Sequence, residues 1–140
     1  MKFVQIVKIN KHRIDKIWDL TEKHLLLLTE HSNEKVRQIG VESATSIILN
    51  QQENEEIFGI FPKLYNSKYK DVRINTLNAL CTVIQRIGQL ISNAWNLILP
   101  ILKEASDGDD ETITIAFKSV KIIGNDYLEN MPIGKFLKTN

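Results

Sequence analysis

The stretch Asp71-Val-Arg-Ile-Asn-Thr-Leu-Asn-Ala-Leu-Cys-Thr-Val83 decides the fold class, because its apolar and small residues recur at the period of an α-helix. A strand buried on one face would alternate between apolar and polar residues instead. Four residues form the stripe, at spacings of four, three and four: Val72, Thr76, Ala79 and Val83. The stretch is therefore predicted to be a helix with one buried face, which Leu80 widens.

The same pattern of spacings occurs twice more in the chain. The matching residues are Val36, Gly40, Ser43 and Ile47, then Ile113, Phe117, Val120 and Gly124, with Ile39, Ala44, Ala116 and Ile123 widening the two stripes. The starting points at 36, 72 and 113 lie 36 and 41 residues apart. That spacing is typical of repeats built from two helices each.

A further apolar helix is predicted ahead of each striped helix, over 14–28, 57–64 and 95–102. Polar turns over 31–33, 66–68 and 106–109 join the two helices of each pair, and they are rich in residues that cap helices. Pro62 and Pro100 fall near the middle of two of the first helices, where a missing N–H is expected to bend them.

A single helical hairpin cannot bury its own apolar stripe, so neighbouring hairpins must stack. We therefore predict an all-α, HEAT/armadillo-like α-solenoid of about three helical hairpins, forming one domain over 1–140. Its expected divisions are the end of a preceding repeat (1–12), three repeats (13–52, 53–90 and 91–130) and a tail (131–140). The alternative is an ordinary globular helix bundle, which the regular spacing disfavours. Because the pattern starts at once, we expect a fragment of a longer protein.

Composition excludes several classes of protein. The chain has 18 Lys and Arg against 17 Asp and Glu, a net charge of +1, so no global field favours nucleic acid or an anionic membrane. The single cysteine, Cys81, cannot form an internal disulfide, and the sequence lacks Asn-x-Ser/Thr, which favours a reducing, cytosolic setting. The longest apolar run, Leu25 to Leu28, is far too short to span a bilayer.

No residue pattern points to catalysis or to a metal. His12, His24 and His31 are spaced by twelve and seven, which does not place them on one helical face. The acidic run from Asp107 resembles the start of a calcium loop, but Lys118 stands where the bidentate Glu would be, so a helix cap is the better interpretation. Cys81 is expected to be an inert core residue. We predict no enzyme, no cofactor, no metal and no small-molecule substrate.

Two stretches resemble a known superfamily. The first contains Arg13, Trp18 and His24; the second runs from Trp95 through Phe117 to Asn125-Asp126. Together they resemble the helical region downstream of the exchange domain in the large Sec-seven-type Arf exchange factors. The resemblance implies structural roles for these seven residues, with Trp18 in the seam between hairpins and His24 hydrogen-bonded to a neighbouring helix end.

Within that superfamily, three motifs are more similar to the Mon-two (monensin-sensitivity) scaffold branch. They are Gly40-Val41-Glu42, the run from Tyr69 to Arg73, and Asn125-Asp126-Tyr127-Leu128 leading to Met131-Pro132. Gly40, His31 and Ser67 depart from a general HEAT consensus. The resemblance implies a scaffold without an exchange domain, cytoplasmic and peripheral to trans-Golgi and endosomal membranes. It also implies trafficking proteins as partners, a Dopey-type protein or an Arf-like GTPase.

Three functional hypotheses follow from the resemblance and the fold. The first is a non-enzymatic scaffold segment for protein–protein interaction in Golgi and endosome vesicle traffic. The second is a regulatory HEAT region of an Arf guanine nucleotide exchange factor whose catalytic domain lies outside this chain. The third, a stand-alone small HEAT adaptor, requires that the chain be complete.

One local basic cluster is predicted at the starts of two successive striped helices. Its members are Lys35, Arg37, Lys68, Lys70 and Arg73. In the favoured interpretation, the two arginines bond within and between hairpins while the lysines are solvated. In the functional alternative, these residues form an edge that binds an acidic partner segment or phosphoinositide headgroups, with possible peripheral membrane contact.

Overall fold

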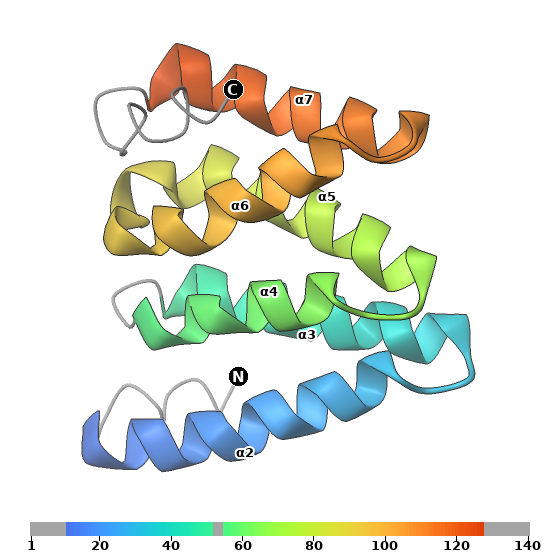
Figure 1. Cartoon of the computed structure of the whole chain (residues 1–140). Helices are drawn as coiled ribbons and strands as arrows, with labels where there is room; N and C mark the ends of the chain where they lie inside the picture. The colour runs from blue at the N-terminus through green and yellow to red at the C-terminus, as the bar shows by residue number, and fades with distance from the viewer. Residues whose placement is uncertain (1–10, 52–54, 128–140) are drawn as a thin grey trace.

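A computed structural model describes residues 11–51 and 55–127, and the side chains of this part from residue 16 onward; within these ranges the chain is helical and contains no strand (Figure 1). The elements in order are α2 (Lys11–Thr29), α3 (Glu34–Asn50), the 3-10 helix η1 (Glu55–Gly59), α4 (Ile60–Tyr65), α5 (Lys70–Ile87), the 3-10 helices η2 (Gly88–Leu90) and η3 (Ser92–Ala94), α6 (Trp95–Ser106) and α7 (Asp110–Asp126).

The helices pair into three hairpins that stack in chain order: α2 with α3, α4 with α5, and α6 with α7 (Figure 1). The second helices pack in succession, α3 on α5 and α5 on α7, while α4 lies between α2 and α6. This arrangement confirms the predicted all-α, solenoid-like stack. It also places the three turns within hairpins along one edge of the stack (Figure 1).

Polar residues of the turns cap two of the three second helices, α3 and α7, as the sequence predicts. The Asn33 side chain accepts a hydrogen bond from the Lys35 backbone N–H at 2.8 Å and begins α3. Asp109 begins α7 by accepting from the Thr112 N–H at 3.0 Å. Ahead of α5, the Ser67 hydroxyl accepts from the Tyr69 N–H at 3.1 Å. The turns before α3 and α7 therefore each satisfy a backbone donor that the helix itself leaves unpaired, whereas α5 has no side-chain cap.

The core is continuous through all three hairpins. Its largest fully buried side chains are those of Trp95, Phe58, Phe61, Ile48, Ile57, Ile60, Leu64, Leu77, Leu80, Ile84, Ile91 and Ile98. Cys81 is buried in α5, in agreement with its predicted place in the core. Because α5 contacts both neighbouring second helices, it has more buried residues than any other described helix.

Gly40 marks the closest approach of α2 and α3. A Cβ atom placed on Gly40 would lie 2.9 Å from Thr29 Cγ2, 3.1 Å from Leu28 Cβ and 3.2 Å from the Leu25 carbonyl oxygen. Real Cβ contacts are almost never so short. The departure from a small apolar residue at this position therefore has a steric reason, since a side chain would push the two helices apart.

The two prolines occupy different positions in their helices. Pro100 lies inside α6, as expected. Pro62 is the third residue of α4, because the segment before Ile60 is the 3-10 helix η1 and not part of a longer α-helix. In the first turn of a helix a missing N–H costs no intrahelical hydrogen bond, so Pro62 is tolerated there without a bend.

The buried face of α7 differs from the predicted stripe by one residue. Ile113 and Phe117 are 39% and 68% exposed, respectively, while Thr112, Ala116, Ser119 and Ile123 are buried. Both sets step by four, three and four, and the small residues of the buried set let α7 approach α5 and α6 closely. Ile39 was also predicted to be buried, yet it is 54% exposed. Ala116 and Ile123, which were predicted to widen the stripe of α7, are buried, so the centre of the predicted stripe is displaced by one residue.

Some predictions fall outside the described residues. They concern the preceding repeat over 1–12, the tail over 131–140 with Met131-Pro132, and the side chain of Arg13.

Candidate functional site

The turn edge brings the predicted basic cluster together, and Arg37 is its most buried member, at 8% exposure. Its Nε and Nη2 donate to the two carboxylate oxygens of Asp71 at 2.9 and 3.0 Å, which joins α3 to α5. Its Nη1 donates to the carbonyls of His31 and Ser32 at 2.8 and 3.0 Å, and the guanidinium carbon lies 3.9 Å from the Tyr69 ring centroid. The hydrogen bond with Asp71 raises the pKa of Arg37.

Arg73 repeats part of this arrangement one hairpin later. Its Nη1 donates to the Ser67 carbonyl at 2.7 Å, six residues back along the chain, as Arg37 does to His31. Both guanidinium groups therefore close the turn of their own hairpin. The planar fork of arginine suits several carbonyl and carboxylate acceptors at once, which a lysine cannot match.

Lys70 joins the second hairpin to the third. Its ammonium lies 2.8 Å from Asp109 Oδ2 and 3.6 Å from Glu111 Oε1 at the start of α7. The hydrogen bond from Lys70, followed by that from the Thr112 N–H, lowers the pKa of Asp109 to about 2. The acidic cluster thus caps α7 and binds a lysine of the neighbouring hairpin.

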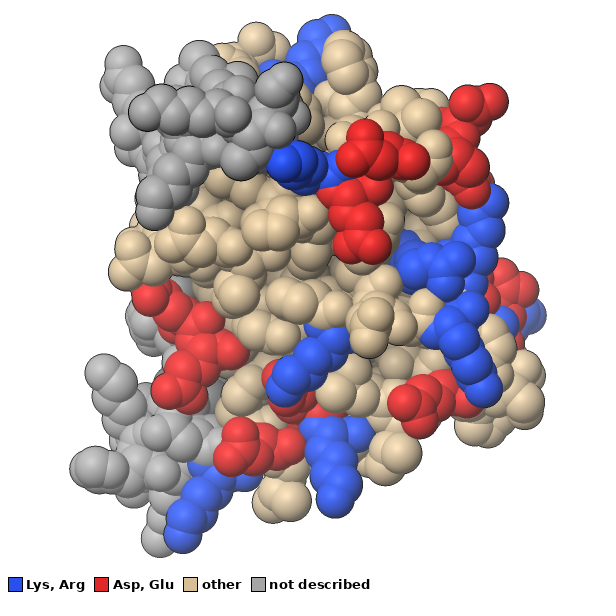
Figure 2. Space-filling view, viewed as in Figure 1, with Lys and Arg blue, Asp and Glu red and all other residues tan. Residues whose placement is uncertain are grey.

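The edge as a whole carries both signs of charge. Figure 2 shows basic and acidic side chains interleaved along the side where the turns lie. Arg37, Arg73 and Lys70 have hydrogen-bond or ion-pair partners, whereas Lys35 and Lys68 are exposed and pair with no carboxylate of the described residues. The Lys68 ammonium lies 5.2 Å from the Tyr69 ring centroid. Binding of a headgroup or of an acidic segment at this edge stays a prediction. The positive charge for such binding would have to come from Lys35 and Lys68.

The seven residues singled out by resemblance do not form one site. Trp18 is buried at 5% exposure and Trp95 is fully buried, with its ring 6.3 Å from that of Tyr127. His24 is exposed and makes no hydrogen bond within the described part of the chain, contrary to the predicted bond with a helix end. The remaining described members, Phe117, Asn125 and Asp126, are exposed on α7.

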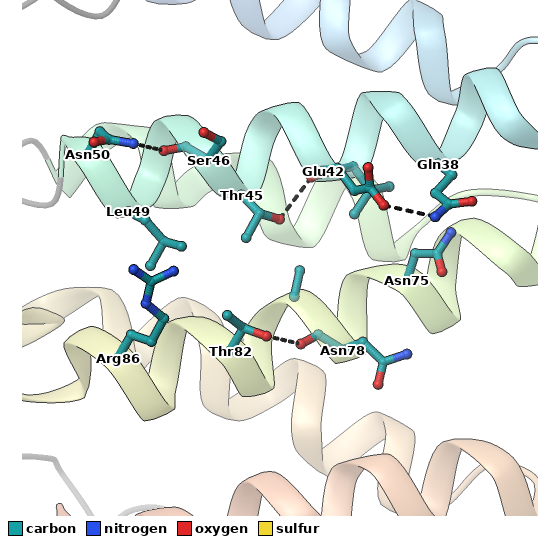
Figure 3. A pocket seen from close by; sticks show the side chains of 12 residues that line it. Gln38, Glu42, Thr45, Ser46, Leu49, Asn50, Asn75, Asn78, Thr82 and Arg86 are labelled. Carbon is teal, nitrogen blue, oxygen red and sulfur yellow. Dashed lines mark hydrogen bonds between the residues drawn. The ribbon is translucent and has the colours of Figure 1, made fainter. Parts of the chain in front are cut away.

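A groove between α3 and α5, which sequence reasoning missed, is formed by two successive second helices (Figure 3). It has a volume of about 460 Å³. From α3 it is lined by Gln38, Val41, Glu42, Thr45, Ser46, Leu49 and Asn50, and from α5 by Asn75, Asn78, Ala79, Thr82 and Arg86. In the sequence, its amide and hydroxyl residues recur at helical spacing beside each stripe, a pattern that any solvent-exposed helix face also shows.

The described residues offer little for metal or membrane chemistry. Over 11–51 and 55–127 no three His, Cys, Asp or Glu side chains gather as a metal site would require. None of the helices in the same ranges has the length and apolar character needed to cross a membrane.

Comparison with known proteins gives a consistent set of similarities. Residues 48–122 match the family model described as Sec7-like HDS, Mon2/Sec7/BIG1-like. The chain is 26% identical over 145 residues to the human protein MON2 homolog, 25% to that of Xenopus laevis and 24% to that of Drosophila melanogaster. Each comparison covers 94% of this chain but only 8 or 9% of the relative. No solved structure matches the chain significantly.

Proposed function

The chain belongs to the Mon2/Sec7/BIG1-like family through its HDS region, and from that premise we propose that it is a non-enzymatic scaffold segment for protein–protein interaction in Golgi and endosome vesicle traffic. The family membership confirms the resemblance found in the sequence. The observation that carries the proposal is the similarity to three MON2 homologs over 94% of the chain.

The architecture supports a positioning role. A stack of hairpins presents long helix faces and grooves to a partner, and its stability comes from contacts between neighbouring hairpins. Here the turn edge holds the hairpins in register through Arg37–Asp71 and Lys70–Asp109. A rigid surface of this kind binds a partner without much ordering of its own residues, which lowers the entropic cost of association.

The partners and location that we propose follow from the family. The partners are proteins of the trafficking machinery, a Dopey-type protein or an Arf-like GTPase, and the location is the cytoplasmic face of trans-Golgi and endosomal membranes. Because the chain spans only 8 or 9% of its relatives, the segment contributes one part of such an assembly.

A deletion in the cell tests the scaffold function. The encoding gene is edited to remove residues 16–127, and the sorting of a transmembrane cargo that recycles through endosomes is followed by surface labelling. We expect the cargo to be missorted, and the edited protein to leave Golgi and endosomal fractions. Normal sorting and fractionation of the deleted protein would refute the proposal, provided that its abundance equals that of the intact protein.

The second candidate function, a regulatory region of an Arf exchange factor, is favoured by the family description, which includes Sec7-like and BIG1-like members. Nucleotide exchange on a purified Arf GTPase distinguishes it from the scaffold. The protein encoded by the complete reading frame would accelerate exchange if this second function is correct, and it would leave the intrinsic rate unchanged if the scaffold function is correct.

A further inference from the structure

The α3/α5 groove contains polar groups that the protein does not use itself. The side-chain amides of Asn75 and Asn78 make no hydrogen bond with any described residue, although both line the groove (Figure 3). Other polar groups are occupied locally: Thr45 donates to the Val41 carbonyl at 2.8 Å, and the Asn50 amide donates to the Ser46 carbonyl at 2.7 Å. Two adjacent amides on α5 are therefore free for a ligand.

The spacing of these two amides suits an extended peptide. Asn75 and Asn78 are three residues apart on one helix, so they lie on the same face of α5. Each carboxamide has both a donor and an acceptor, the complement of a peptide group. Main-chain hydrogen bonds of this kind give affinity for a partner segment whose side chains then determine specificity.

The groove carries one charge of each sign, at opposite ends. Glu42 lies near Gln38 and Asn75, and its carboxylate accepts a hydrogen bond from the Gln38 amide at 2.8 Å (Figure 3). Arg86 lies at the other end, opposite Leu49, and no carboxylate of the described residues pairs with it. The groove is thus electrostatically polar along its length, with a free cation at one end.

The separation of the two charges follows from helix geometry. Seven residues separate Glu42 from Leu49, which at 1.5 Å per residue places the acidic and basic ends roughly 10 Å apart. An extended chain advances about 3.3 Å per residue, so about three residues span the same length. A nucleic acid strand would meet the Glu42 carboxylate unfavourably, and an acyl chain would have to bury the amide, hydroxyl and charged side chains that make up most of the lining.

We propose that the α3/α5 groove binds an extended segment of a partner protein that has Lys or Arg opposite Glu42 and Asp or Glu, about three residues away, opposite Arg86. Asn75 and Asn78, which lie toward the Glu42 end of the groove, hydrogen-bond the backbone of that segment (Figure 3). This proposal rests on the scaffold function and adds to it the binding surface and the chemistry of the segment that is bound.

Selection from a random library tests the proposal while the partner itself is still unidentified. The probe is a displayed library of random ten-residue peptides, selected on the intact 140-residue chain, and enriched peptides are synthesised with a fluorescent label for anisotropy titration. We expect them to share a basic and an acidic residue about three positions apart. Exchanging the two charged residues for Ser should weaken binding by about tenfold each, as expected for loss of a charged hydrogen bond.

Variants of the groove identify the binding surface. Asn75→Ala and Asn78→Ala should each weaken binding by about fivefold, and Arg86→Glu by more than about tenfold, with a weaker dependence on salt than the wild type. The matched controls are Asn96→Ala on α6 and Lys118→Glu on α7, which are exposed and outside the groove. Because these three side chains make no hydrogen bond or ion pair with the described residues, the substitutions should leave the circular dichroism spectrum unchanged.

Enrichment of no peptide, or enrichment of peptides that bind all three groove variants as well as the wild type, would overturn the proposal. Failure of the groove and failure of the scaffold function are distinguishable in the cell. If deletion of 16–127 missorts cargo while the triple variant Asn75→Ala, Asn78→Ala, Arg86→Glu sorts it normally, the scaffold function stands and the groove is not its binding surface. If the deletion is harmless, the scaffold function itself fails.

Discussion

Two neighbouring substitutions on α7 test which of its faces is buried. Phe117 is 68% exposed, although the sequence pattern predicts it on the buried stripe, and its neighbour Ala116 is fully buried. Full burial of a Phe side chain is worth about 1.5–3 kcal/mol, so the covered third of Phe117 contributes about 0.5–1 kcal/mol. Alanine has a higher helix propensity than phenylalanine, which stabilises the variant by roughly 0.5 kcal/mol. Phe117→Ala should therefore lower the free energy of unfolding by at most about 0.5 kcal/mol.

Ala116→Leu should have a larger effect, because the new methylenes enter a packed seam. Overpacking of a core typically costs about 1–3 kcal/mol. The two variants and the wild type are compared by urea denaturation, with unfolding followed by tryptophan fluorescence, since Trp18 and Trp95 are both buried and become exposed to water. The slopes of the three transitions should agree, so that a shift in midpoint reports stability.

The opposite result would refute this packing of α7. If Phe117 filled the core, its truncation to Ala would cost about 3–5 kcal/mol. A cost of that size for Phe117→Ala, with a neutral Ala116→Leu, would show that the helix is rotated by one residue from the arrangement described above.

Three further predictions follow. Gly40→Ala should destabilise the chain, because its Cβ meets α2, while Gly124→Ala, which meets nothing within 4 Å, should stabilise it by about 0.5–1 kcal/mol; thermal unfolding of both measures the contrast. Arg37→Lys keeps the charge but loses the paired hydrogen bonds, so it should lower the urea midpoint, and Asp71→Asn should cost little more in that background. The pKa of Asp109, lowered to about 2, lies below the value of about 3.9 expected in the unfolded chain. Its contribution to stability is thus complete above about pH 4 and lost as the pH falls toward 2, and Asp109→Asn should flatten that acid limb.

Each of these predictions can fail clearly. Equal stability of the two alanine variants would mean that Gly40 has more room than the structure gives it. Full additivity of Arg37→Lys and Asp71→Asn would mean that the pair is not coupled. If NMR shows that the carboxyl group of Asp109 titrates near its ordinary pKa, the ion pair with Lys70 is not formed in solution.

The sequence predicted the fold class and the helix pairing because both depend on periodicity. The stripe of α5 is correct at all four positions, Val72, Thr76, Ala79 and Val83, since that helix is covered on both sides by neighbours. The same pattern was misleading in α7, where Phe117 faces away from the described helices. Periodicity gives the spacing of a stripe, but which of two adjacent faces is buried depends on the size of the side chains that meet there.

Less of the candidate site than of the fold could be predicted from the sequence. The partners of Arg37 could be anticipated only in kind, because Asp71 lies 34 residues away and stacking alone brings it near. The α3/α5 groove was missed for a similar reason: Gln38 and Asn78 look like ordinary surface residues until two helices align. Surfaces formed between repeats have no signature within either repeat.

The ion pairs at the turn edge have a consequence for how the stack responds to salt. The ion pairs Arg37–Asp71 and Lys70–Asp109 join the three hairpins along the edge where the turns lie. On the opposite side of the stack, the chain passes from α5 to α6 through the short helices η2 and η3. On that opposite side the Tyr127 hydroxyl donates a neutral hydrogen bond to the Gln85 carbonyl at 3.2 Å. Raised ionic strength should therefore weaken the links at the turn edge more than those on the opposite side.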